Sequence, residues 1–214
     1  MKKRVANKKL VRKGSSSRSL PKNEKGILGL YKQSWRYLVE SRRFILYSVI
    51  IFIIFILIGF FVPVPKEVET KLLEFLKELA KETEGMNALQ LTAYIFWNNL
   101  KSSFFGMIFG VGLGIFPLIT AGVNGYVVGY VSMIVSEKSS ILELWRLLPH
   151  GIFELPAVFI SLGLGLRMGM FIFNEHKIES LLYYLKNSLI VFFLIVLPLL
   201  IIAAIIEGLL ISLI

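Results

Sequence analysis

The sequence has 214 residues, of which 56% are hydrophobic and only 18% are charged, and its mean hydropathy is +0.72. Soluble domains are about 45–50% apolar and about 25% charged, so this composition excludes a soluble globular protein and indicates a polytopic membrane protein. The sequence contains no cysteine and no aspartate, and its two histidines are His150 and His176. Disulfides, thiolate metal sites and Ser-His-Asp triads are thereby excluded. We expect no cofactor and no bound metal.

Positive charge is concentrated at the N-terminus. Residues 1–43 contain 14 Lys and Arg and two Glu, a net charge of +12. They precede the apolar residues 44–62, which as a helix are long enough to cross a hydrocarbon core of about 30 Å. The positive-inside rule then predicts a cytoplasmic N-terminus. We expect residues 1–26 to form a basic disordered tail, attracted to anionic membrane lipid rather than to nucleic acid, ahead of a single membrane domain over 27–214.

Residues 66–84 predict an amphipathic helix rather than a span. Pro63 and Pro65 end the first span, and leucines such as Leu72 and Leu76 then recur at helical spacing among lysines and glutamates. The segment has a net charge of −2, which argues against docking on anionic lipid. With the N-terminus inside, this helix lies outside the cell. We expect the bundle, a second copy or an extracytoplasmic partner protein to cover its apolar side.

The stretch of residues 102–136 contains no charge over 35 residues. One straight helix of that length would measure about 52 Å, too long for a single span, yet two full spans of about 20 residues do not fit. The most even division places a turn at Thr120-Ala121-Gly122, between two short spans or the arms of a re-entrant hairpin. Asn124 would then lie at or just inside the cytoplasmic boundary.

The complete pattern predicts an all-α, polytopic transmembrane bundle of about five spans with short or broken middle helices. Pro149 and Pro156 fall in the fourth span, and Pro198 falls in the fifth. Five spans from a cytoplasmic N-terminus place the C-terminus on the extracytoplasmic side of the cell membrane. The predicted spans are residues 44–62, 102–120, 121–136, 147–173 and 188–214.

Three ionisable side chains form a stripe in the fourth span. Arg146, His150 and Glu154 lie at positions i, i+4 and i+8, on one helical face. Ionisable groups inside a membrane are costly and suggest function. A site that handles protons or ions, an anchor for a partner helix and a structural network near the helix start fit this stripe equally well. A hydrolytic zinc site needs three protein ligands, so we expect no catalytic residue here.

Glycines recur at four-residue spacing in three of the predicted spans. Such ladders let helix backbones approach closely in lipid, and amide side chains can add hydrogen bonds between the helices. We expect at least two ladders to pack within one subunit and one face to remain for self-association into a homo-oligomer. The ladder glycines are Gly106, Gly110, Gly114, Gly125, Gly129, Gly165 and Gly169, and the amides are Asn98, Asn99 and Asn124.

Several of these residues together resemble the stage II sporulation protein M family over roughly residues 30–214. The resemblance implies a small polytopic membrane protein that acts as a membrane scaffold recruiting partner proteins or as a transporter-like component, and it supplies no catalytic residues. The segments that carry it are Asn98-Asn99, Asn124-Gly125, Leu148-Pro149-His150-Gly151, Glu154-Leu155-Pro156-Ala157 and Gly163-x-Gly165.

We therefore predict a non-enzymatic integral membrane scaffold that self-associates and recruits partner proteins. The alternative is a small transporter or channel subunit that uses Arg146, His150 and Glu154, because broken helices near the membrane midplane are typical of transport sites. An intramembrane hydrolase built on His150 and Glu154 has the least support.

Overall fold

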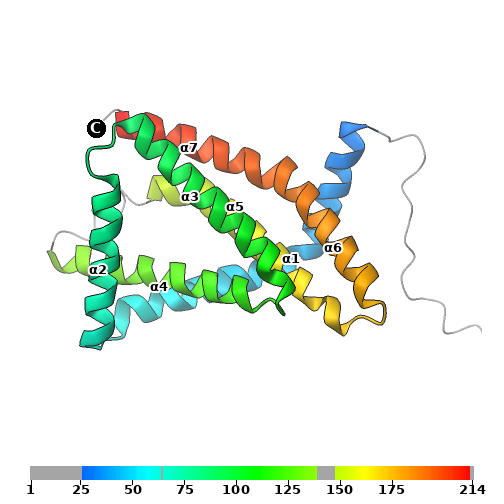
Figure 1. The fold of residues 1–214 in the computed structure, drawn as a ribbon, viewed down its shortest axis with the longest axis horizontal. Helices are drawn as coiled ribbons and strands as arrows, with labels where there is room; N and C mark the ends of the chain where they lie inside the picture. The colour runs from blue at the N-terminus through cyan, green and yellow to red at the C-terminus, as the bar shows by residue number, and fades with distance from the viewer. Residues whose placement is uncertain (1–25, 64, 139–147, 213–214) are drawn as a thin grey trace, which may run out of the picture.

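The computed structural model describes residues 26–63, 65–138 and 148–212, which form helices and short connections without a strand (Figure 1). This confirms the predicted all-α fold. Residues 1–25 of the predicted basic tail lie outside the described part of the chain. The helices are α1 (Ile27–Phe61), α2 (Lys66–Thr83), α3 (Ala88–Ile108), α4 (Ile115–Lys138), α5 (Leu148–Gly169), α6 (Lys177–Val191) and α7 (Leu197–Ser212).

Four stretches of helix in the described residues are long and apolar enough to cross a membrane. The helix α3 is not among them, so the number of spans and the side on which α2 lies stay predictions. The last stretch joins α6 to α7 through a π-helical turn, η4 (Phe192–Val196). Pro198, which lacks a backbone N–H, follows this turn. The four stretches are Ile27–Phe61, Ile115–Glu137, Glu154–Phe173 and Lys177–Ile206.

Close contacts between backbones give the direction of each helix. Gly125 of α4 lies against Phe52 of α1, and Gly129 lies against Ile56, so α1 and α4 run parallel. From the first contact to the second, the residue number increases by four in both helices, which is about one helical turn. The two helices therefore stay in contact over successive turns, as Figure 1 shows.

The helix α5 runs antiparallel to α1. Gly163 of α5 lies against Ile45, whereas the Ser48 hydroxyl, one turn further along α1, donates a hydrogen bond of 3.1 Å to the carbonyl oxygen of Phe159, one turn earlier in α5. The second of these contacts also satisfies a hydroxyl that is fully buried.

The helix α7 runs antiparallel to α3. Thr92 near the start of α3 lies against Gly208 near the end of α7, and the rings of Phe104 and Phe192 pack edge to face with centroids 5.3 Å apart. The helices α1, α3, α4, α5 and α6–α7 thus alternate in direction along the chain. The α2 segment and the end of α7 lie at one end of the bundle, opposite the α3–α4 turn (Figure 1).

The reversal between α3 and α4 corrects the predicted position of the turn. The chain turns at η1 (Phe109–Val111) and the residues up to Gly114, and α4 then runs without interruption through Thr120-Ala121-Gly122. Leu113 and Gly114 have φ values of 60° and 71°, which a right-handed helix cannot contain. Pro117 lies in the first turn of α4, where its missing N–H costs nothing.

Two predicted spans, 102–120 and 121–136, are therefore wrong in their bounds. The helix α3 begins much earlier, at a capping box in which the Asn87 side chain accepts from Gln90 N (2.9 Å) and the Gln90 side chain accepts from Asn87 N (3.0 Å). Asn124 lies inside α4 rather than at a turn.

The other helices lie close to their predicted positions but differ in length. The helix α2 ends one residue before the end predicted for 66–84, and α5 continues into the short helix η3 (Met170–Phe173) within the predicted 147–173. The helix α1 begins at Ile27 rather than at residue 44, and α6 begins at Lys177 rather than at residue 188. Polar helical turns therefore extend two of the predicted spans at their N-terminal ends.

The hydrophobic core lies where α1, α3, α5 and α6–α7 meet. Its buried members come from every one of these helices, and methionine and phenylalanine fill the space beside small residues. They are Tyr37, Met107, Ala157, Leu164, Met168, Val191, Phe192, Val196 and Leu200.

Candidate functional site

Each ladder glycine lies against another segment of the same chain. A Cβ atom on Gly110 would overlap the backbone carbonyl of Gly165, and one on Gly129 would overlap the carbonyl of Ile56. Gly169 in turn lies against the backbone at Gly114. These contacts allow the close backbone approach that the ladders predict.

The same geometry leaves no ladder face for a second copy. The expectation that one glycine face remains free for self-association is wrong, because the contacts of α3 and its following turn are with α5 and those of α4 are with α1. The pairs are Gly106 with Leu162, Gly110 with Gly165, Gly114 with Leu166, Gly125 with Phe52, Gly129 with Ile56, Gly165 with Gly106 and Pro117, and Gly169 with Gly114.

One member of the predicted polar stripe is fully described. Arg146 lies outside the described residues, as does the side chain of His150, whose backbone belongs to α5. Glu154 is half-buried and, with Asn99 of α3 and Leu200 of α7, lines a cavity of about 10 Å³. The structure thus brings together Asn99 and Glu154 from separate helices. The cavity holds at most about one water molecule.

The other two predicted amides do not link helices. Asn124 is exposed, and its Nδ2 donates to the carbonyl oxygen of Thr120, one turn earlier in α4, at 2.9 Å. Asn98 is also exposed and lies beside Tyr94 and Lys101 on the rim of an open pocket next to α2. The predicted polar group is therefore divided among three places.

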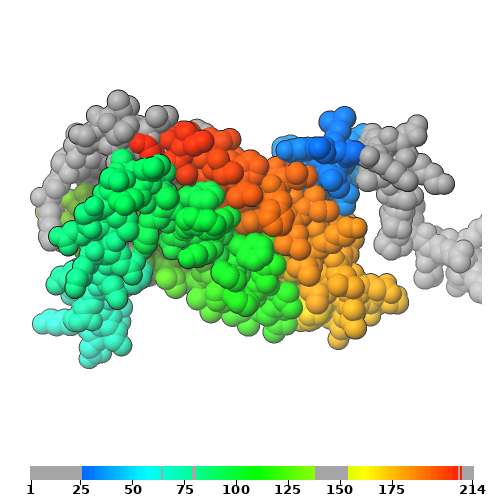
Figure 2. Space-filling model, turned by 45° about the horizontal axis from the view of Figure 1, so that its top comes forward, coloured from blue at the N-terminus to red at the C-terminus, as the bar shows by residue number. Residues whose placement is uncertain are grey.

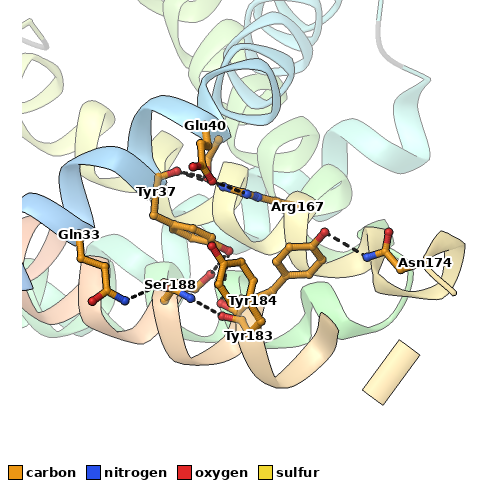
Figure 3. A network of polar contacts seen from close by, with 10 residues as sticks. Gln33, Tyr37, Glu40, Arg167, Asn174, Tyr183, Tyr184 and Ser188 are labelled. Carbon is orange, nitrogen blue, oxygen red and sulfur yellow. Dashed lines mark hydrogen bonds and ion pairs between the residues drawn. The ribbon is translucent and has the colours of Figure 1, made fainter. Parts of the chain in front are cut away.

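A larger polar cluster, which the sequence analysis missed, lies near the C-terminal end of α5 (Figure 3). The guanidinium of Arg167 donates to Ser41 Oγ at 2.8 Å, to the carbonyl oxygen of Tyr37 at 3.1 Å and to Glu40 Oε2 at 3.0 Å. It also lies over the Tyr37 ring, 4.1 Å from the centroid, in a cation–π contact. The Arg167 side chain is 13% exposed and that of Glu40 is 46% exposed, so solvent screens this ion pair in part.

The cluster continues into α6. The Tyr37 hydroxyl donates to the carbonyl oxygen of Tyr184 and lies 3.3 Å from Ser188 Oγ. Gln33 Nε2 donates to Asn187 Oδ1 at 2.8 Å. Hydrogen bonds thereby hold α1 to α5 and α6, which are far from it in sequence, in a largely buried place.

The chemistry of this cluster is structural. An arginine stays protonated in proteins, so Arg167 orients groups and neutralises charge but transfers no proton. Sequence reasoning could have found it, because Arg167 is the one charged residue between Glu154 and Glu175. An isolated charge in an apolar helix indicates a specific partner, and the partner here is Glu40.

The helix α2 stands apart from this packed bundle. It runs across the ends of α1 and α4 in Figure 1, and Figure 2 shows it along one side of the molecule, with its first turns projecting. A hydrogen bond of 2.5 Å from the Tyr94 hydroxyl to Glu82 links it to α3. Val68 and Phe75 are seven residues apart and therefore lie on the same face of α2, and their side chains are 45% and 46% exposed. Part of its apolar side is therefore not covered by the residues that the structure describes.

Comparison with known proteins agrees with this architecture. Residues 48–210 match the family model described as stage II sporulation protein M. The chain is 34% identical over 137 residues to an uncharacterized protein of Methanocaldococcus jannaschii, covering 61% of this chain and 60% of that relative, less than two thirds of its length. No solved structure matches the chain. Because the family model covers more than half of the sequence, the protein belongs to the stage II sporulation protein M family.

Proposed function

We propose that this helical membrane protein is a non-catalytic scaffold that self-associates and recruits a partner protein through α2. In this proposal five helical segments cross the bilayer, α2 and the C-terminus lie outside the cell, and the N-terminus lies inside. The alternating direction of the helices supports this topology, and so does the net charge of +12 in residues 1–43.

The proposal requires α3 to act as the second crossing despite its polarity. The helix has 21 residues and is about 31 Å long, close to the thickness of the hydrocarbon core. Asn99 lines the small cavity beside Glu154, and the Thr92 hydroxyl donates a hydrogen bond to the carbonyl oxygen of Ala88 within the same helix. Bundle helices and the backbone thus cover part of its polar surface, which lowers the cost of immersing it.

The observation that carries the proposal is the exposed apolar edge of α2. Val68 and Phe75 lie on the same helical edge and are both nearly half exposed, whereas Leu72 and Leu76 of α2 are partly covered. Exposed aromatic and aliphatic side chains on an amphipathic helix are typical anchors for a partner protein. A balance of charges around them, rather than an excess of lysine, favours a protein over an anionic membrane surface.

Photo-crosslinking tests this surface. A photoreactive phenylalanine analogue is placed at Phe75, and in a separate variant at Val68, in the full chain in its native membranes. We expect both to capture one and the same protein. An analogue at Glu74, which points about 100° away around the helix, is the matched control and should not capture it. Crosslinks to lipid alone, or equal capture at Glu74, would overturn the proposal.

We place self-association on the outer face of α4. Ile119 and Val123 are each 57% exposed there, and Asn124 presents its amide oxygen beside them. In lipid, an exposed amide favours a hydrogen bond to a second helix by about 0.6–2 kcal/mol. Because the chain has no cysteine, Val123→Cys should form disulfide-linked dimers on oxidation. Ile54→Cys, on an exposed part of α1, is the matched control, and dimers from Ile54→Cys alone would contradict this interface.

Transport through the bundle is the second candidate, because Glu154 and Asn99 meet between three helices. Their cavity has room for about one water molecule, which supports transport less well than the surface of α2 supports recruitment. If Glu154→Gln abolished ion or proton flux into proteoliposomes while the helical fold was retained, transport would become the better supported function. Flux no greater than in liposomes without the protein would remove the transport candidate, and equal flux in Glu154→Gln and the unmodified protein would remove Glu154 from it.

A further inference from the structure

A groove of about 970 Å³ opens between α1, the α3–α4 turn and the end of α5. Its volume is at the upper end of the range of about 300–1,000 Å³ that is usual for small-molecule sites. The α1 wall changes character along the helix, from charged residues to aliphatic ones. The lining residues that matter below are Glu40, Arg42, Arg43, Ile50, Leu113 and Leu118.

The charged part of this wall has an excess of positive charge. Glu40 is neutralised by its ion pair with Arg167, at 3.0 Å. Arg42 and Arg43 are exposed, and within the described part of the chain neither forms an ion pair. Two neighbouring guanidinium groups, each a planar fork of donors, match the geometry of a phosphate group.

The deeper part of the groove is apolar. Ile50 lies seven residues after Arg43, which is about 10 Å further along α1. Leu118 of α4 and Leu166 of α5 line the facing side. A molecule that fills the groove therefore meets cations at one end and hydrocarbon over the rest of its length.

The turn between α3 and α4 closes the groove in a strained conformation. Leu113 has a φ of 60°, an uncommon value for a residue other than glycine, although glycines stand on both sides of it. Its side chain lines the groove and is 56% exposed. Residues held in this region of φ are strained and often cluster at ligand-binding sites.

We propose that this groove binds one anionic phospholipid from the surrounding membrane, with its phosphate between Arg42 and Arg43 and a hydrocarbon chain against Ile50 and Leu113. Basic pockets between membrane helices bind anionic lipid headgroups in this way. A free phosphate would leave the apolar wall uncovered, and the phosphate of a zwitterionic lipid such as phosphatidylcholine carries a cation that repels the two arginines. The site is independent of partner recruitment by α2, so a test of lipid binding does not depend on whether the scaffold function is correct.

Lipid binding to the purified full chain tests this proposal. The protein is stripped of lipid in neutral detergent and titrated with dioleoyl phosphatidylglycerol or dioleoyl phosphatidylcholine, and bound lipid is counted by native mass spectrometry. We expect one phosphatidylglycerol to bind at least about tenfold more tightly than phosphatidylcholine. Replacing both arginines, R42Q/R43Q, should abolish this preference, since each well-placed arginine contributes about fivefold in affinity.

Matched variants separate this site from general attraction to lipid. R36Q/K186Q removes the same charge from exposed positions that do not line the groove and should keep the preference. Ile50→Trp fills the groove and should lower the affinity for phosphatidylglycerol at least about tenfold, whereas Ile53→Trp, which is exposed on α1 outside the groove, should not.

Two results would overturn the proposal. Equal losses in R42Q/R43Q and R36Q/K186Q would show that net charge alone attracts the lipid. Unchanged binding in Ile50→Trp would show that no lipid occupies the groove. Circular dichroism of each variant checks that its helices are intact, and Ile53→Trp controls for the cost of adding a tryptophan to α1.

Discussion

The helix bundle and α2 are built from opposite kinds of contact. In the bundle, glycine brings backbone against backbone, as where Gly129 meets Ile56 and Gly110 meets Gly165. The α2 helix is linked to α3 by a hydrogen bond between the side chains of Tyr94 and Glu82, and part of its apolar side is exposed. This difference shows that the bundle helices are packed too closely for a partner to bind between them, whereas α2 has an exposed apolar surface to which a partner could bind.

The largest effect should follow from adding one methyl group to the bundle. In Gly129→Ala and in Gly110→Ala the new Cβ would overlap a backbone carbonyl that cannot move aside. We expect each to destabilise the fold by about 2–3 kcal/mol and to lower the melting temperature in detergent by about 4–10 °C. Gly112→Ala is the matched control, because its Cβ would meet the nearest atom at 3.4 Å. An equal effect at Gly112 would show that the backbone contacts are not what holds the bundle.

A smaller effect should follow from opening the polar cluster at the end of α5. Arg167→Met removes the bonds to Ser41, Tyr37 and Glu40 together. Because Glu40 is nearly half exposed, we expect a loss of about 1–2 kcal/mol rather than the cost of a fully buried charge. Glu40→Gln should cost less, about 0.5 kcal/mol. Thermal unfolding of both variants measures this, and a larger loss in Glu40→Gln would contradict the central place of Arg167.

The smallest effect on the fold should follow from releasing α2. Tyr94→Phe removes the hydroxyl that donates to Glu82, and we expect the melting temperature of the bundle to stay within about 2 °C. Limited proteolysis within α2 should become faster, since local opening of this helix no longer breaks that bond. Tyr126→Phe, on α4, is the control and should leave the proteolysis rate unchanged. A large drop in melting temperature in Tyr94→Phe would mean that α2 is part of the bundle.

Helical periodicity and hydropathy were enough to predict the all-α membrane fold and α2 nearly to the residue. The pattern failed where a helix had to end inside an apolar stretch. Gly106, Gly110 and Gly114 were interpreted as a helical ladder, but the chain bends at Leu113 and Gly114 with positive φ. Three glycines in five residues at this bend, followed by Pro117, are also the signature of a break, and hydropathy does not distinguish the two.

The polar contacts were harder to predict because they depend on which helices meet. The spacing of Arg146, His150 and Glu154 describes one helix, whereas Glu154 shares the lining of its cavity with Asn99 of another helix. Arg167 was visible as a lone charge, but its position beside Glu40 follows from the antiparallel packing of α5 against α1. One sequence without its tertiary contacts does not contain that information.

Labelling from the two sides of the membrane tests the central claim, which is that α2 lies on the extracytoplasmic side of a bundle with five membrane crossings. Because the chain has no cysteine, Lys71→Cys in α2 and Lys177→Cys at the start of α6, both at exposed positions, can be labelled singly with a membrane-impermeant maleimide. The account predicts that Lys71→Cys reacts in intact cells, whereas Lys177→Cys reacts after the membrane has been opened. Reaction of both cysteines from the same side, with full labelling of each in denatured protein, would contradict it.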